Sequence, residues 1–218
     1  MGTHVAIVGT AESLTQAPFG DGSIEIWAVP AVLSRPGVTR VTRIFELHGK
    51  PVVDHYLNAM TASGAAIMLQ DRRDDIPNSE RYPIEDVTRM FGSYLTNSIS
   101  YMMAYAMLVC VDRIDLYGIN MSYTTEYAEQ RPSCEYFIGL ARGKGIEVSV
   151  HQDSDLLKAS YLYGYGSPSP VRAVIAGRIR KYQDNLEKLQ AELDRVSNSI
   201  EQHRGALTAA KYFLQALD

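Results

Sequence analysis

Three small polar residues, Thr96, Asn97 and Ser98, stand directly before a segment that is apolar on nearly every helical face. One explanation is helix capping, because a side-chain oxygen of Asn or Ser there accepts a hydrogen bond from a free backbone N–H. The other is a bound phosphate or ribose, since a helix N-terminus with hydroxyl and amide groups favours an anion. A single cap needs only one of these residues, so the cluster predicts ligand binding in addition to capping.

A second polar cluster follows the first apolar run of the chain, His4–Val8, in the stretch VGTAESL. Gly9 allows close approach to the backbone, and Thr10 and Ser13 offer hydroxyl groups beside the start of the next expected helix. The stretch lacks the GxGxxG spacing of dinucleotide-binding proteins. An ordinary strand-to-helix turn explains it as well as an anion site does.

The third candidate segment is LYGINMSYTTEYAEQRP (Leu116–Pro132), an expected loop after a strand that Gly118 closes. Asn120, Tyr123 and Tyr127 supply amide and phenol groups there. Loops at the carboxyl end of a strand frequently bind polar ligands. A surface loop with two packing tyrosines is the alternative interpretation.

His48 lies in FELHGKPVVDH, near Glu46, Asp54 and His55. The two histidines lack the HExxH or similar spacing of zinc sites, so no metal site is expected. His48 is chemically suited to general acid–base catalysis. A structural histidine with a satisfied hydrogen bond is an equally good explanation.

Short apolar runs alternate with helical segments from the N-terminus to Val150. This alternation predicts an α/β fold with a doubly wound, mainly parallel, Rossmann-like sheet. Ligands of such sheets bind beyond the carboxyl ends of the strands, where the three candidate segments lie. The stretch RRDDIPNSERY (Arg72–Tyr82) is expected to be a polar loop before a helix that starts at Pro83. The expected strands are His4–Val8, Ile24–Val29, Ala65–Gln70, Arg113–Ile119 and Ile146–Val150, with Arg43–His48 as a strand or the entry to a short helix.

The C-terminal part of the chain carries apolar or small residues at alternating steps of four and three. This repeat is typical of a left-handed coiled coil, so we expect a long C-terminal coiled-coil helix that joins copies into a homo-oligomer through residues 175–218. The expected domains are residues 1–168 and 170–218. His203 and Gly205 weaken the pattern and favour a helix break, and an internal hairpin against the first domain is the alternative. The repeat comprises Ile175, Ile179, Tyr182, Leu186, Leu189, Leu193, Val196, Ile200, His203, Leu207, Ala210, Leu214 and Leu217.

Composition limits the function classes. The formal net charge of −4 argues against general affinity for nucleic acid, which is held mainly by clustered Lys and Arg. Cys110 and Cys134 form neither a disulfide framework nor a CxxC metal clamp, which fits a reducing cytoplasm. Cys110 ends an apolar helix and is expected to be a buried thiol. The first strand begins close to the N-terminus and no apolar run reaches ~18 residues, so neither a signal peptide nor a membrane span is expected.

Together, these segments resemble the family 42 sialyltransferases and the related MptE-like Rossmann-fold proteins that many bacteria and phages encode. In these families a TSG or SS turn opens an apolar helix, and a strand led by Lys or Arg then ends in GID. VAIVGTAESL resembles their opening strand with its GNGPSL or GTGPSL turn, and EYFIGLARGKGIEV resembles a later helix-to-strand segment. The resemblance covers about 150 residues from the N-terminus. The matching positions are Thr96, Asn97 and Ser98, then Arg113–Leu116, then Gly118, Ile119 and Asn120.

The resemblance implies that the first domain binds a nucleotide and belongs to a metal-independent transferase. The donor would be a nucleotide-activated group, above all a nucleotide sugar, and no further cofactor is expected. Tyr123 and Tyr127 are expected to stabilise the leaving nucleotide by hydrogen bonding, and His48 and Glu135 are the candidates for the general base. The expected nucleotide-binding residues are Gly9, Thr10, Ser13, Thr96, Asn97, Ser98, Gly118 and Asn120.

The chain also departs from the family pattern. The sialyltransferases carry a histidine base before a YIG-like segment, where CEYFIG places Glu135 or Tyr136 here, and Pro30 stands near the place of a usual asparagine. The heptad helix is no part of that pattern. These departures favour an alternative, a non-catalytic protein that senses or sequesters a nucleotide; a third hypothesis makes the C-terminal helix the working part. The likeness to phage proteins implies location in a host cytoplasm, with nucleic acid only as an acceptor.

Overall fold

The computed structural model describes residues 2–121, 125–159, 162–164 and 171–215 of the chain. Within these ranges, the side chains of residues 125–127, 171–174, 213 and 215 are not described. The chain divides into two compact units, Met1–Leu157 and Lys158–Asp218. Tyr123 lies outside the described residues, and for Tyr127 only the backbone is described.

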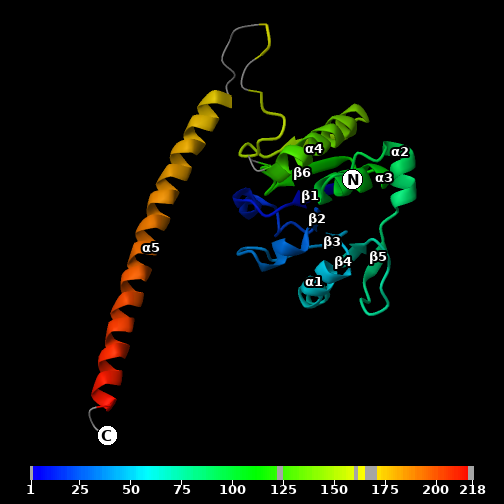
Figure 1. The fold of residues 1–218 in the computed structure, drawn as a ribbon. Helices are drawn as coiled ribbons and strands as arrows, with labels where there is room; N and C mark the ends of the chain where they lie inside the picture. Colours follow the sequence, from blue (N-terminus) through cyan, green and yellow to red (C-terminus); the bar gives the residue numbers. More distant parts are fainter. Residues whose placement is uncertain (1, 122–124, 160–161, 165–170, 216–218) are drawn as a thin grey trace. The chain divides into compact units, whose positions relative to one another are not determined.

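The N-terminal unit is built on a seven-stranded sheet with the order β5-β4-β3-β2-β1-β6-β7. Every described strand pair is parallel, which confirms the predicted α/β class (Figure 1). From β1 the chain adds β2 to β5 on one side of the sheet and then returns to add β6 and β7 on the other side. The strand order therefore reverses between β1 and β6. The strands are β1 (His4–Val8), β2 (Glu25–Ala28), β3 (Arg43–Glu46), β4 (Ala66–Leu69), β5 (Ser79–Arg81), β6 (Arg113–Tyr117) and β7 (Glu147–Val150).

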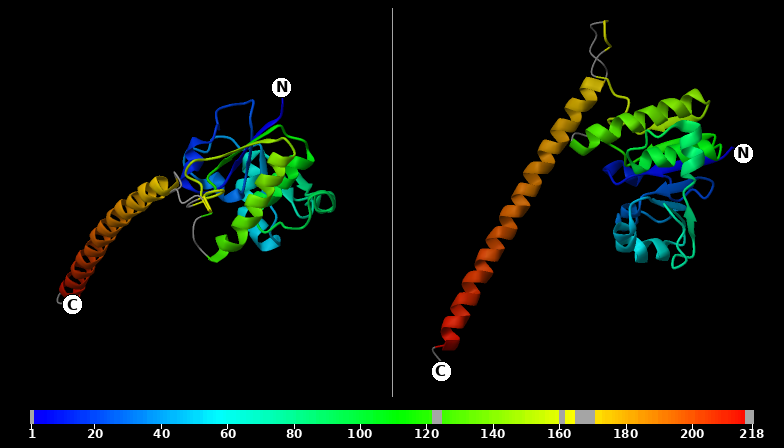
Figure 2. Two further views of the ribbon diagram at one scale, coloured as in Figure 1. Left: turned by 90° about the horizontal axis from the view of Figure 1, so that it is seen from above. Right: turned by 45° about the vertical axis from the view of Figure 1, so that its right-hand side comes forward.

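Helices cover both faces of the sheet, as expected for double winding (Figure 2). On one face, α2 (Ile84–Phe91), α3 (Ser98–Leu108) and α4 (Thr125–Gly143) enclose the largest core, in which Ile7, Met103 and Phe137 are buried. On the other face, the 3₁₀ helices η1 (Glu12–Gln16) and η2 (Pro30–Ser34) and the helix α1 (Lys50–Ser63) cover two smaller cores. The helix α3 packs against β1, β3, α2 and α4. Seven of its eleven residues are buried and none is exposed, which explains its apolar sequence.

Three expectations about local structure are wrong. The predicted polar loop Arg72–Tyr82 contains the edge strand β5, which pairs with β4. The predicted loop Leu116–Pro132 ends early, because α4 begins at Thr125 and includes Pro132. Cys110 is exposed rather than buried, since it follows the end of α3 in a left-handed turn with φ 57°.

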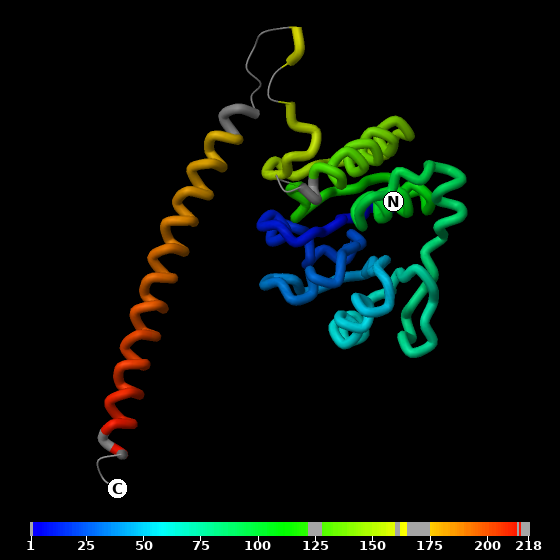
Figure 3. The backbone as a smooth tube through the Cα atoms, in the orientation of Figure 1, coloured from blue at the N-terminus to red at the C-terminus, as the bar shows by residue number. Residues whose placement is uncertain are grey.

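The C-terminal unit contains one long helix, α5 (Val171–Gln215). The break expected near His203 and Gly205 is absent, and the helix runs through both residues without interruption (Figure 3). Within the described part of the chain, no helix is long and apolar enough to cross a membrane.

Candidate functional site

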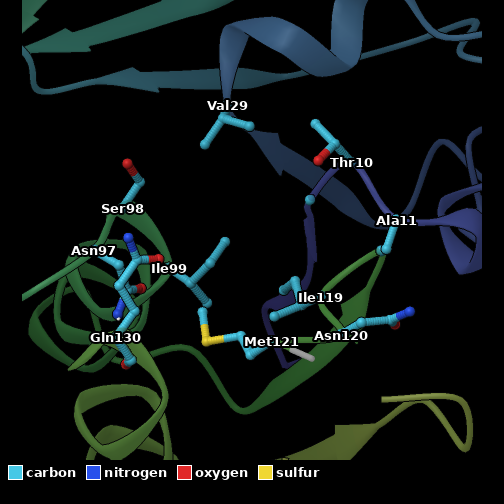
Figure 4. Close-up of a pocket in the computed structure, with 12 residues that line it drawn as sticks. Thr10, Ala11, Val29, Asn97, Ser98, Ile99, Ile119, Asn120, Met121 and Gln130 are labelled. Carbon is cyan, nitrogen blue, oxygen red and sulfur yellow. Dashed lines mark hydrogen bonds between the residues drawn. The ribbon is translucent and has the colours of Figure 1, made fainter. Parts of the chain in front are cut away.

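A pocket with a volume of about 330 Å³ opens at the carboxyl ends of β1, β2 and β6, beside the N-terminus of α3 (Figure 4). This is where the strand order reverses, the usual ligand position in open parallel sheets. Six of the predicted nucleotide-binding residues contribute to its wall. The described lining residues are Gly9, Thr10, Ala11, Val29, Asn97, Ser98, Ile99, Gly118, Ile119, Asn120, Met121 and Gln130.

Two glycines form the base of the pocket, where the turns after β1 and β6 meet. Gly118 has φ +65°, a left-handed conformation that glycine adopts without strain. Its carbonyl oxygen accepts a hydrogen bond from the Ala11 N–H at 2.9 Å, and its N–H donates to the Ser13 hydroxyl at 2.9 Å. Ser13 is buried and therefore joins the two turns instead of facing the pocket. The short 3₁₀ helix η1 also differs from the expected anion-binding helix start, because the Ala11 N–H is already bonded.

Asn97 is the N-cap of α3, and its side chain is fully engaged within the protein. Its Oδ1 accepts the Ser100 N–H at 3.0 Å, and its Nδ2 donates to the Ser100 hydroxyl and to the Gln130 carbonyl, both at 3.0 Å. Capping and the attachment of α3 to α4 therefore account for this amide, although it also lines the pocket. Thr96 lies outside the lining and donates its hydroxyl to the Glu129 carbonyl at 3.2 Å.

Beneath the cap, a buried serine pair holds α3 against α4. The hydroxyl oxygens of Ser100 and Ser133 are 2.7 Å apart, and the Ser133 hydroxyl donates to the Tyr94 carbonyl at 2.5 Å. The adjacent Cys134 is buried, and this burial raises the pKa of its thiol to about 12. The thiol therefore stays protonated near neutral pH and has no nucleophilic thiolate to offer.

The groups left for a ligand are neutral donors. The hydroxyls of Ser98 and Thr10 lie on opposite sides of the pocket (Figure 4) and form no hydrogen bond with the described residues. In the same part of the chain, no acceptor takes the backbone N–H groups of Ser98 and Ile99 in the first turn of α3. These N–H groups carry the positive end of the helix dipole, equivalent to roughly half an elementary charge. The arrangement suits an anion such as a phosphate.

Asn120 adds an acceptor to the neighbouring wall. Its Oδ1 is buried and has no hydrogen-bond partner in the described structure, whereas its backbone carbonyl accepts the Asp155 N–H at 3.0 Å. A buried oxygen without a donor is costly, so a ligand N–H or O–H would be favoured there. Met121 follows in a left-handed conformation with φ 49° and places its side chain in the lining.

No ionisable side chain occurs among the described lining residues, and both candidate bases lie outside that lining. Glu135 Oε1 pairs with Arg131 at 2.8 Å and also accepts the Leu157 N–H at 2.8 Å, so both structural partners share one oxygen of this carboxylate. His48 follows β3 at the same edge of the sheet, and its side chain is 64% exposed. Its Nδ1 lies 2.5 Å from the carboxylate of the buried Glu46, so Nε2 is the ring nitrogen that this pair leaves unused.

Sequence reasoning missed half of the lining. Ala11, Val29, Ile99, Ile119 and Met121 are neighbours of predicted residues or strand ends, so the strand pattern could have found them. Gln130 could not be found in this way, since it stands on a turn of α4 that was expected to be a loop. Among the described residues, no cluster of three or more His, Cys, Asp or Glu side chains could hold a metal ion.

A scan against models of protein families finds no match for this chain, and neither does a search of curated proteins. Among solved structures, the chain is similar to the sialyltransferase CST-II in complex with a trisaccharide acceptor and CMP, with a TM-score of 0.47 and 12% identity over 68% of this chain and 80% of that one. It is also similar to CstII from Campylobacter jejuni in complex with the substrate analogue CMP-3FNeuAc, with a TM-score of 0.47 and 13% identity over 78% and 96% of the two chains. Similarity at this level carries no inference about ligand or reaction.

Proposed function

We propose that the N-terminal unit binds a nucleotide in the pocket between β1, β6 and α3, with a phosphate at the N-terminus of α3. The observation that carries this proposal is a set of pocket donors that no described residue uses: the Ser98 hydroxyl and the N–H groups of Ser98 and Ile99 on one side, and the Thr10 hydroxyl on the other. The apolar side chains of Val29, Ile119 and Met121 provide a surface for a base or a ribose. The volume of about 330 Å³ falls within the range of small-molecule sites.

The neutral lining supports a phosphate of low charge, held without a cation. A group with several negative charges would need Lys, Arg or a metal ion to offset the cost of leaving water. The pocket instead offers hydrogen bonds and a helix dipole, which best suit a singly charged phosphodiester. The phosphate of a nucleotide joined to a sugar has this character.

We further propose that the reaction is metal-independent transfer from a nucleotide-activated donor, most simply a nucleotide sugar. The sequence resemblance to the family 42 sialyltransferases supports this activity. His48 is the stronger candidate for the base that takes the acceptor's proton, because Glu46 orients its ring and Nε2 is accessible. Glu135 is the weaker candidate, since its carboxylate is already paired. Tyr123 and Tyr127 remain the predicted partners of the leaving phosphate.

A second candidate function is non-catalytic nucleotide binding. The observation that favours it is the lack of an ionisable group among the described lining residues, which leaves the pocket itself without an acid or a base. Both candidates require the same ligand site. They differ only in whether the bound nucleotide is turned over.

Metal-free titration tests the shared part of the two proposals. The protein is mixed with each nucleoside monophosphate and with common nucleotide sugars in the presence of EDTA, and its thermal unfolding is followed. A ligand at ~100 times its Kd stabilises the folded state by about 2.7 kcal/mol, which is a shift of several degrees. A flat response to every nucleotide rules out the binding site.

Turnover separates the two candidates once a ligand is known. The release of the leaving nucleotide from the bound nucleotide sugar, a monophosphate or a diphosphate according to the donor, is followed by chromatography for the unaltered chain, His48→Gln and His55→Gln. The exposed His55 lies in the same segment and serves as the matched control. Transfer with His48 as base requires that only His48→Gln lose turnover while its nucleotide affinity is kept. Binding without any turnover establishes the non-catalytic function.

We propose in addition that the chain self-associates through residues 175–218, as the apolar repeat on α5 supports. The large apolar side chains of this repeat are exposed in the single chain, with Leu186 at 67% and Leu193 at 60%. A stripe of this length is stable in water when another helix covers it.

A further inference from the structure

The residues of the apolar repeat on α5 indicate whether a second helix would pack against it in a parallel or an antiparallel orientation. In heptad notation its residues alternate between two core positions, a and d. The a positions are Ile179, Leu186, Leu193, Ile200, Leu207 and Leu214, and the d positions are Ile175, Tyr182, Leu189, Val196, His203 and Ala210. Gly177 and Gly205 both fall at position f, on the opposite side of the helix, so neither interrupts the stripe.

A parallel pair of these helices would be poorly packed. In a parallel, in-register pair, each core layer contains the same residue twice. Parallel two-stranded coiled coils favour Leu at d, but among the d positions within α5 only Leu189 meets this preference. The remaining layers would bury two phenols at Tyr182, two imidazoles at His203 and a gap between two copies of Ala210. The His203 imidazole keeps one partner, since its Nδ1 lies 2.7 Å from the Ser199 carbonyl oxygen. Two bulky rings crowded into one layer and unfilled space in another nevertheless destabilise a core.

An antiparallel pair avoids these layers of two identical residues, because each a residue then faces a d residue of the other copy. In the register that overlaps the whole repeat, Leu193 faces Val196 near the centre. Ala210 then faces Ile179, and His203 faces Leu186. Tyr182 faces Leu207, and every layer combines one bulky aliphatic side chain with one other residue.

The charges along α5 favour the same orientation. Residues 172–181 carry four cations and no anion, namely Arg172, Arg178, Arg180 and Lys181. A parallel pair would bring the two basic ends together. An antiparallel pair separates them by the length of the helix, which is well beyond the Debye length of about 8 Å at physiological ionic strength.

From these observations we infer that α5 forms an antiparallel two-stranded coiled coil with a second copy of this chain, with Leu193 facing Val196 of the other helix. The inference deepens the proposed self-association and does not depend on nucleotide binding. The N-terminal unit is joined to the same end of α5 in each copy, so the pair tethers its two ligand sites to opposite ends of the coil.

Distances between spin labels test the orientation in the full-length chain. Ala209 and Arg195 both occupy the outward position c, so each is replaced by Cys in a Cys110→Ser background and labelled. In the inferred register Ala209 lies level with Arg180 of the other copy, 29 residues along the helix, which is about 44 Å at ~1.5 Å per residue. Arg195 lies level with Asp194, so its two labels stay close in either orientation.

The inferred arrangement requires a mass of two chains in light scattering, a short distance for the Arg195→Cys pair and a distance of roughly 44 Å or slightly more for the Ala209→Cys pair. Short distances at both sites indicate a parallel pair and overturn the inference. A mass of one, three or four chains overturns it as well. Because both labels lie outside the N-terminal unit, a nucleotide titration of the same variants reports separately on the ligand site.

Discussion

Gly9 and Gly118 touch through their backbones at the base of the pocket, where a Cβ atom on Gly9 would lie 2.5 Å from the carbonyl oxygen of Gly118. No side chain fits at that distance. The contact brings the turn after β1 against the turn after β6, and the Ser13 hydroxyl bonded to the Gly118 N–H fixes it in place. The base of the pocket is therefore set by the fold before any ligand arrives.

Gly118→Ala is expected to lower the free energy of unfolding by more than the cost of placing alanine in a left-handed backbone conformation. Alanine in the left-handed region costs roughly 1–2 kcal/mol, and its Cβ would also lie 2.8 Å from the carbonyl carbon of Gly9. Gly37→Ala provides the control, since Gly37 has φ +84° with open space around it. The free energy of unfolding in urea should fall further for Gly118→Ala than for Gly37→Ala. Equal losses of unfolding free energy would show that the contact of the new Cβ with the Gly9 backbone adds no destabilisation.

Ser98→Ala is expected to weaken nucleotide binding about tenfold or more. A hydrogen bond to a charged group contributes ~1.5–3 kcal/mol, and each ~1.4 kcal/mol changes an equilibrium constant tenfold. Isothermal titration without metal measures the change. Ser149→Ala on the exposed face of β7 is the control and should leave the affinity unchanged. An unaltered Kd for Ser98→Ala would contradict the proposed position of the phosphate at the N-terminus of α3.

Ser133→Ala is expected to lower both the stability of the chain and its nucleotide affinity. The substitution leaves the Tyr94 carbonyl without its hydroxyl donor and removes one partner of the buried Ser100 hydroxyl, which keeps the donor Asn97 Nδ2, at a cost of roughly 1–3 kcal/mol. It also loosens the attachment of α3 to α4 and therefore the position of Ser98. Ser79→Ala, which removes an equally buried serine on the distant edge strand β5, should reduce stability without changing the Kd. If both variants keep the affinity, the serine pair has a structural role only.

The two thiols are expected to differ in reactivity. Cys110 is exposed, whereas burial raises the pKa of Cys134 to about 12, so the reactive thiolate of Cys134 is scarce in the folded state at any pH below that value. A disulfide reagent at pH 8 should modify one thiol per folded chain quickly and the second only after unfolding. Because the folded-state pKa of Cys134 is raised above its ordinary 9.0, its contribution to stability is full below pH 9 and is lost as the pH rises towards 12. The variant Cys110→Ser should lose the fast reaction, and a fast reaction that persists would contradict the burial of Cys134.

The sequence allowed most of the sheet to be predicted because buried parallel strands are apolar along their whole length. β1 and β4 follow this pattern closely, and β2, β6 and β7 each keep at least two buried or half-buried apolar residues that mark them as strands. β5 does not, since its residues Ser79, Glu80 and Arg81 are polar and it is held at the edge of the sheet mainly by backbone hydrogen bonds to β4. An edge strand of this kind has no hydrophobic pattern from which it could be predicted.

The site was predictable where it depends on strand ends and unpredictable where it depends on tertiary contacts. Gly9, Thr10 and Ser98 could be predicted as site residues because they stand directly after an apolar strand or directly before an apolar helix. The hydrogen bond from the Asn97 amide to the Gln130 carbonyl could not be predicted from the sequence. Pro132 argued against a helix at that point, although α4 in fact includes it. Likewise, the pairing of Ser13 with Gly118 joins residues 105 positions apart.

The neutral lining of the pocket has a consequence for the pH dependence of binding. None of the described lining side chains gains or loses a proton between pH 5 and 9, so the protein presents the same donors throughout this range. The described lining therefore contributes no change in nucleotide affinity there, and a change that persists in His48→Gln comes from the ligand. A monoester phosphate has its second ionisation near pH 6 and should show such a change, whereas the diester-like phosphates of a nucleotide sugar should bind with constant affinity. The shape of the titration against pH thus reports which form of phosphate occupies the site.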